Sequence, residues 1–147
     1  MNIFALSECP EQSALWLDDI RKNKMILESA QMLSTAVRHL TPDTDLPVYR
    51  VAYLNHPCTI WARQSRDNFR WLVSHMRSLF NQKSGRHKSA DLLPYFDKYT
   101  EGGAFPSEGR TPFANCARNQ ERGVDYSDVS DVHGAYRLYM NDRWKER

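Results

Sequence analysis

The stretch Asp18–Leu33, DDIRKNKMILESAQML, decides the fold that this sequence predicts. Read as a helix, it carries long polar side chains at steps of three and four residues, and so on one face: Arg21, Lys24, Glu28 and Gln31. An apolar stripe occupies another face and continues beyond the stretch: Ile26, Ala30, Leu33, Val37 and Leu40. Such a helix is typical either of a solvated surface or of the wall of an active site.

The composition is that of an ordinary globular protein. The chain has 147 residues, 41% of them hydrophobic and 26% charged, which favours a single domain spanning residues 1–147. Its net charge of +2 is too small to indicate a nucleic-acid partner by itself, although it does not exclude local basic clusters. No apolar run reaches the roughly 18–20 residues of a membrane span, and the N-terminus lacks the pattern of a signal peptide. We therefore expect a cytoplasmic protein without a membrane partner.

The cysteines and the absent motifs narrow the chemistry. Cys9, Cys58 and Cys116 are far apart and in no paired spacing, which favours reduced thiols over a disulfide framework or a zinc site. The sequence also lacks a Gly-rich phosphate loop, a His-Glu-x-x-His pattern and a Gly-x-Ser-x-Gly elbow. Nothing here indicates a nucleoside triphosphatase, a zinc enzyme or a serine hydrolase. We expect neither a metal nor a cofactor.

Prolines mark the helix starts in the first half of the chain. A short helix starts at Pro10 and is separated by a bend from the helix that contains Lys24. Residues 46–54 are predicted to be extended. Pro57 then opens a helix, capped by Asn55 or His56, that should run unbroken to about residue 82.

The second half is less regular. Pro94 should kink or end a short helical piece, and a loop-like segment should follow over residues 98–123. The apolar island Thr111–Ala114 is expected to pin this segment to the core. A final helix should start near Asp131 and end near Trp144. The predicted fold class is mainly α, a compact bundle of three or more helices with a long irregular segment before the C-terminal helix.

Two features could carry chemistry. Lys24 and Glu28 form a pair of opposite charge four residues apart, which is common on solvated helices but would also suit a general base beside a cation for anionic groups. The helix start at Asn55-His56-Pro57 offers free N–H groups to an anion, and His56 is either a cap or a proton shuttle. Trp61 is predicted to lie in the core rather than to stack on a base. Arg63 belongs to a basic face that is either solvated or a phosphate footprint.

The sequence resembles a family of small, uncharacterised phage and bacterial proteins. The resemblance rests on the start MNIF, on KMxLExAQxL from Lys24, on NHPCxIWARxSxxNxxWL from Asn55, and on the later TPFA at residues 111–114. It runs in order over most of the chain. It implies a shared fold more than an activity.

A more distant resemblance is to phage-type pyrimidine-dimer DNA glycosylases, which are small helical repair enzymes. In that family the N-terminal α-amine attacks the sugar C1′, a helix Glu assists, and Arg side chains grip phosphates. The resemblance implies that Glu28 is the catalytic Glu and that Arg21 and Lys24 are the basic residues before it. The chain departs from the family at its N-terminus, because Asn2 disfavours removal of Met1, whereas the family exposes a Thr amine.

These observations together favour an enzyme that acts on a base–sugar bond in DNA or a nucleotide. Glu28 would be the acid, base or charge stabiliser, with His56 and Lys24 as further catalytic residues. The expected substrate-binding residues are Arg21, Gln31, Asn55, Trp61, Arg63 and Asn68. The alternative is a non-catalytic phage-type protein that binds a nucleotide, a nucleic acid or a host-defence partner. A scaffold with merely solvated charges is a third interpretation.

Overall fold

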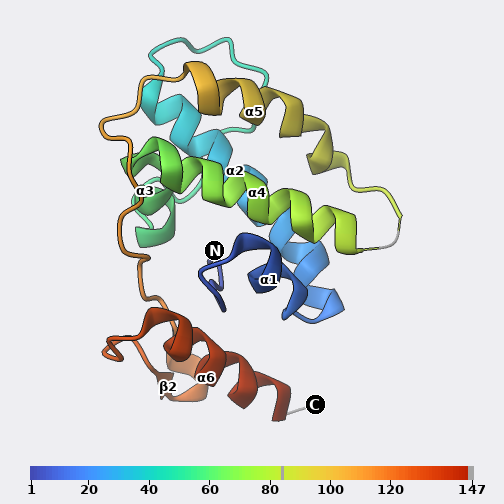
Figure 1. Cartoon of the computed structure of the whole chain (residues 1–147), viewed down its shortest axis with the longest axis vertical. Coiled ribbons are helices and arrows are strands. Elements are labelled where there is room, and N and C mark those ends of the chain that lie inside the picture. Colours follow the sequence, from blue (N-terminus) through green and yellow to red (C-terminus); the bar gives the residue numbers. More distant parts are fainter. Residues whose placement is uncertain (84, 146–147) are drawn as a thin grey trace.

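The chain folds into a mainly α-helical structure, as its periodicity predicts (Figure 1). The computed structural model describes residues 1–83 and 85–145. Its α-helices are α1 (Pro10–Leu15), α2 (Asp19–Leu40), α3 (Pro57–Gln64), α4 (Arg66–Gln82), α5 (Leu93–Gly102) and α6 (Val132–Lys145). Short 3-10 turns are η1 (Lys88–Leu92) and η2 (Gln120–Arg122), and one small antiparallel pair joins β1 (Arg118–Asn119) to β2 (Val124–Asp125).

Helix α2 is the central element of the bundle. It starts where Asp18 caps it, since the Asp18 side chain accepts a hydrogen bond from the Arg21 N–H at 3.0 Å. The predicted apolar stripe is confirmed: Ile26, Ala30 and Leu33 are fully buried, as is Val37. This stripe packs against α3 and α4, and α1 packs against α4. The predicted bend between the first two helices is confirmed by the turn between α1 and α2.

The prediction of a single helix from Pro57 to residue 82 is wrong, because the helix is interrupted at Ser65. Ser65 is extended, with φ −152° and ψ 160°, and its hydroxyl caps α4 by accepting from the Asn68 N–H at 3.0 Å. The N–H groups of Arg66 and Asp67, the first two residues of α4, donate to carbonyls in the connection after α5. A serine that caps a new helix thus outweighs the continuous periodicity across it.

The predicted irregular segment over residues 98–123 is too long. Pro94 lies in the first turn of α5, where it needs no hydrogen-bond partner for its nitrogen, and the helix continues to Gly102. The connection that remains covers residues 103–117. It is pinned to the core where expected, since the Phe113 ring stacks on Trp61 with centroids 4.5 Å apart. The predicted extended segment at residues 46–54 contains no strand.

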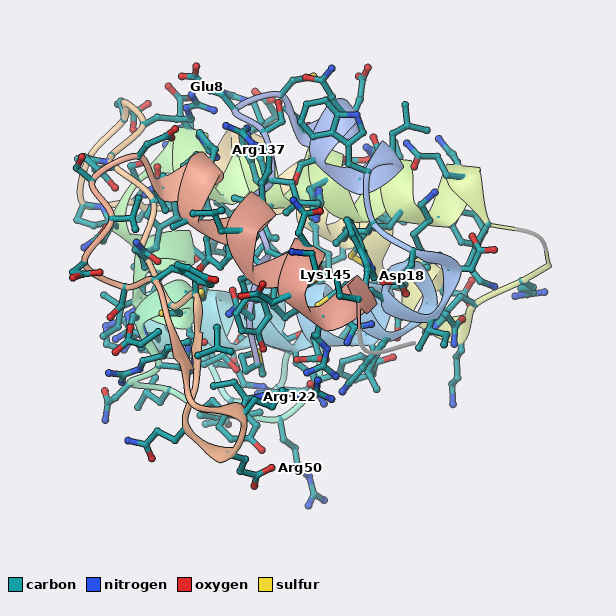
Figure 2. All side chains as sticks on the ribbon, turned by 90° about the horizontal axis from the view of Figure 1, so that it is seen from below. Glu8, Asp18, Arg50, Arg122, Arg137 and Lys145 are labelled. Carbon is teal, nitrogen blue, oxygen red and sulfur yellow. The ribbon has the colours of Figure 1, made fainter. Side chains whose placement is uncertain are left out.

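The N-terminal segment lies between the α3–α4 layer and α6, with the connection running along one side of the molecule towards α6 (Figure 1). The end of α6 returns to the start of α2, where the Trp144 indole donates to Asp18 Oδ2 at 2.7 Å. Figure 2, with Asp18 and Lys145 labelled, shows this approach. Among the residues the structure describes, no helix has the length and apolarity needed to span a bilayer.

Candidate functional site

The centre of the candidate site is an ion pair between the N-terminal α-amine and a carboxylate of the central helix α2. The α-amine of Met1 lies 3.2 Å from Glu28 Oε1, and both side chains are largely buried, at 1% and 13% exposure. The other carboxylate oxygen, Glu28 Oε2, is buried and has no hydrogen-bond partner within the described part of the chain. Buried polar atoms are nearly always satisfied, so an orphaned carboxylate oxygen marks a position where a ligand or water belongs.

Asn2 holds the amine in this position. Its Oδ1 accepts from the backbone N–H groups of Ile3 and Phe4, at 2.8 and 3.1 Å, while its Nδ2 donates to the Cys116 carbonyl at 3.1 Å. Phe4 has a φ of +55°, an unusual backbone conformation for a bulky residue, and its ring stacks on Tyr139. Strain of this kind is held only where surrounding contacts enforce it, and it clusters at functional sites.

Two cavities meet at the Met1–Glu28 contact. The first, of about 360 Å³, is walled by four cationic side chains: Arg21, Lys24, Arg118 and Arg143. The second, of about 440 Å³, shares Met1, Lys24 and Glu28 and extends to Gln31, Tyr53 and His87. Both have the size of a small-molecule site. Their cationic walls suit an anionic ligand such as a phosphate.

The structure therefore brings together part of the predicted set. Arg21, Lys24, Glu28 and Gln31 line the two cavities, as their shared helix face predicted. Arg21 is the most constrained of them, since its guanidinium donates to Asp18 at 3.2 Å and it is 7% exposed.

His56 lies beside the same charges without lining either cavity. Its Nδ1 accepts from the Cys58 N–H at 3.1 Å, so it caps α3 as one of the two predicted candidates. Burial lowers the pKa of His56; the Met1 ammonium lowers it further, while Glu28 raises it. Asn55 is exposed and lines neither cavity.

Three further predicted binding residues are placed in structural roles instead. Trp61 is 2% exposed and donates its indole N–H to the Thr111 carbonyl at 3.1 Å, so no base can stack on it. Asn68 is fully buried, and its amide bonds the Trp61 carbonyl and Thr111. Arg63 donates to the Leu54 carbonyl at 2.6 Å and fixes the loop before α3. None of the three lines the two cavities.

Sequence reasoning missed the cations contributed from the C-terminal third. Arg118 starts β1 and Arg143 lies on α6, yet both line the first cavity. No periodic pattern connects them to α2, because their proximity depends on how the connection and α6 fold back. Tyr53 was also missed: it is 67% exposed, has a φ of +51° and borders the second cavity.

The three cysteines are less scattered in space than in sequence. Cys58 and Cys116 are hydrogen-bonded through their side chains, and His56 lies beside them. That hydrogen bond, assisted by burial, raises the pKa of Cys58, and it lowers the pKa of Cys116 to about 7. The nearby Arg118 and the Met1 ammonium also lower the pKa of Cys116. The two cysteines form a compact donor cluster with His56, although their spacing in the sequence argued against a zinc site.

Comparisons of the chain with family models, with curated proteins and with solved structures find no match. The functional argument therefore rests on the geometry of the site.

Proposed function

We propose that this protein acts on a base–sugar bond in DNA or in a nucleotide, as a glycosylase-like enzyme. One observation carries the proposal: the Met1 amine lies 3.2 Å from Glu28 Oε1, where two cavities with cationic walls meet. A nucleophilic nitrogen beside a carboxylate suits attack on a carbon that bears developing positive charge.

The chemistry follows from these two groups. The Met1 ammonium first gives up one proton to solvent. The resulting free amine attacks the sugar C1′, and an N–C1′ bond forms as the C1′–base bond breaks. The base leaves with the bonding electron pair and takes a proton from solvent. Glu28 stabilises the cationic sugar and accepts the proton that the attacking amine loses. Its unpartnered Oε2 is an oxygen that a substrate can approach without breaking an existing bond.

The cavity walls suit the rest of such a substrate. Lys24, Arg118 and Arg143 line the first cavity, where their positive charges suit phosphates, and Arg21 lines it while paired with Asp18. Enzymes that act on a base within DNA usually extrude it and stack it on an aromatic side chain. Tyr53 fits that role better than Trp61, because it is exposed and borders the second cavity.

Replacement of one carboxylate tests the proposal. Glu28→Gln keeps the shape of the side chain but removes the charge and the base. It should reduce cleavage of DNA carrying abasic sites or pyrimidine dimers by about 10²–10⁴-fold while leaving binding to the same DNA nearly unchanged. The matched control is Glu11→Gln, an exposed acid on α1 that lines neither cavity, which should leave cleavage intact.

Two results would contradict the proposal. If the wild-type protein binds such DNA tightly but never cleaves it, the polar face serves a non-catalytic binder of nucleic acid or nucleotide. If Glu28→Gln changes neither cleavage nor binding, Glu28 is a structural residue and the proposed site is wrong.

A further inference from the structure

A second cluster with metal-ligand chemistry lies beside the candidate site. The donor atoms of His56, Cys58 and Cys116 all lie within 4.8 Å of one another. They come from different parts of the fold: His56 caps α3, Cys58 is the second residue of that helix, and Cys116 lies near the end of the connection before β1. Among the described residues, this is the group of three His, Cys, Asp or Glu side chains close enough to share one ion.

We propose that His56, Cys58 and Cys116 form a binding site for a thiophilic divalent cation of the zinc class. Two thiolates and one imidazole are the ligand set that selects such ions over Mg²⁺ or Ca²⁺, which prefer oxygen. Three protein ligands leave a fourth tetrahedral position for water. The proposal stands independently of the glycosylase-like function, since it depends on different side chains.

The cluster is close to the required size. Zinc–sulfur and zinc–nitrogen bonds of about 2.3 and 2.0 Å imply donor–donor distances of about 3.5–3.8 Å. Because the donor atoms lie within 4.8 Å of one another, the widest separation must shrink by at most about 1 Å. The Cys116 side chain can supply that movement by rotating, because it is half-buried on an irregular segment, whereas Cys58 is fixed in a helix.

Ion binding exchanges contacts that the cluster already makes. The His56 lone pair now accepts from the Cys58 N–H, and a metal would take that lone pair in its place. The Cys58 thiol now donates to Asn2 Oδ1 at 3.7 Å, and it would lose its proton to the solvent on binding the ion. The N-terminus of α3 favours the resulting negative charge on Cys58.

The bound ion would tie together two distant segments of the chain. Cys116 is held by Asn2 and by the Tyr136 hydroxyl, which accepts from its N–H at 3.0 Å. Asn2 in turn sets the position of the Met1 amine. A metal at this point would therefore fix the connection and the N-terminal segment against α3.

Cobalt titration of the full chain under a non-thiol reductant tests the site. Co²⁺ should bind one-to-one, with thiolate charge-transfer absorption, and Zn²⁺ should displace it. Cys58→Ser and Cys116→Ser should each weaken binding by more than ~100-fold, because loss of a direct ligand exceeds the usual cost of an outer-shell change. His56→Gln should weaken binding as well. Cys9→Ser is the matched control, since Cys9 is an exposed thiol outside the cluster and its loss should change nothing.

Circular dichroism of each variant shows whether it is folded, and Cys116→Ser is the decisive one because Cys116 is only half-buried. The proposal is overturned if wild-type protein gives no thiolate absorption with Co²⁺, or if the folded Cys116→Ser variant binds as tightly as the wild type.

Discussion

The Asn2 carboxamide bonds the carbonyl of Cys116, a residue 114 positions later, while it also closes the turn that aims the Met1 amine at Glu28. One side chain thus joins the N-terminal segment to the connection before β1. The position of the proposed nucleophile depends on tertiary contacts that form only after the C-terminal third has folded back.

Asn2 should therefore control the amine without touching the substrate. Asn2→Leu removes the two bonds that Asn2 accepts from backbone N–H groups and the one it donates, and should lower the free energy of unfolding by about 1–3 kcal/mol. Asn2→Asp keeps the acceptor and should lose less. Both variants carry a large second residue, which preserves Met1. Denaturant unfolding with mass spectrometry of the N-terminus measures this, and equal stability of all three proteins would contradict it.

The salt dependence of DNA binding should identify the phosphate contacts. Each phosphate neutralised by a cation contributes about −0.9 to the slope of log K against log salt concentration for duplex DNA. Lys24→Ala and Arg118→Ala should each reduce the magnitude of the slope by about 0.9. Arg86→Ala is the control, since Arg86 is 81% exposed, is paired with Asp91 and lines neither cavity. If Arg86→Ala changed the slope and Arg118→Ala did not, DNA would bind to a surface other than the two cavities.

Much of the bundle could be predicted from the sequence because its signals are local. Residues a few positions apart define the apolar stripe Ile26–Val37 and the helix starts at Pro10 and Pro57. A single apolar island predicts the packing of Phe113 on the core. The Ser65 break was missed because one capping hydroxyl is a weaker signal than a continuous apolar period.

The candidate site was predictable only along α2. Arg21, Lys24, Glu28 and Gln31 share a helix face, so spacing alone groups them. The contributions of Arg118 and Cys116 come through an irregular connection whose path no periodicity encodes. Conversely, Asn68 lies in a specific-looking motif but serves the core, where it satisfies buried polar groups.

His75 should make the protein sensitive to acid. It is fully buried, its Nε2 has no partner in the described residues, and burial lowers its pKa to about 4. Because the folded state holds His75 neutral while the unfolded chain protonates near pH 6.5, its stability contribution is present above that pH and lost as pH falls towards 4. Between about pH 7 and 4.5 the loss should be about 2–3 kcal/mol.

The variant His75→Gln isolates this effect. Glutamine can still donate to the Pro10 carbonyl, which His75 Nδ1 contacts at 3.0 Å, but it does not titrate. Its free energy of unfolding should fall less with acidification than that of the wild type, whatever the constant cost of repacking. Parallel pH profiles for the two proteins would show that His75 is not the group responsible.

Cys116 should be the pH-dependent thiol. With a pKa of about 7, its alkylation by iodoacetamide in the presence of a chelator should be half-maximal near pH 7. Cys58 should react slowly, because it is buried and its pKa is raised. Peptide mapping after short exposures resolves the sites. Cys58→Ala removes the neighbouring thiol that lowers the pKa of Cys116, so its alkylation midpoint should lie at a higher pH.

The central claim is that the Met1 amine attacks the sugar, and borohydride trapping tests it most directly. Incubation with DNA carrying abasic sites or pyrimidine dimers, followed by borohydride, should give a covalent protein–DNA adduct that peptide mapping assigns to the amine of residue 1. Acetylation of that amine should abolish the adduct. No adduct with either DNA, or an adduct on a lysine side chain that survives acetylation of the α-amine, would contradict the account.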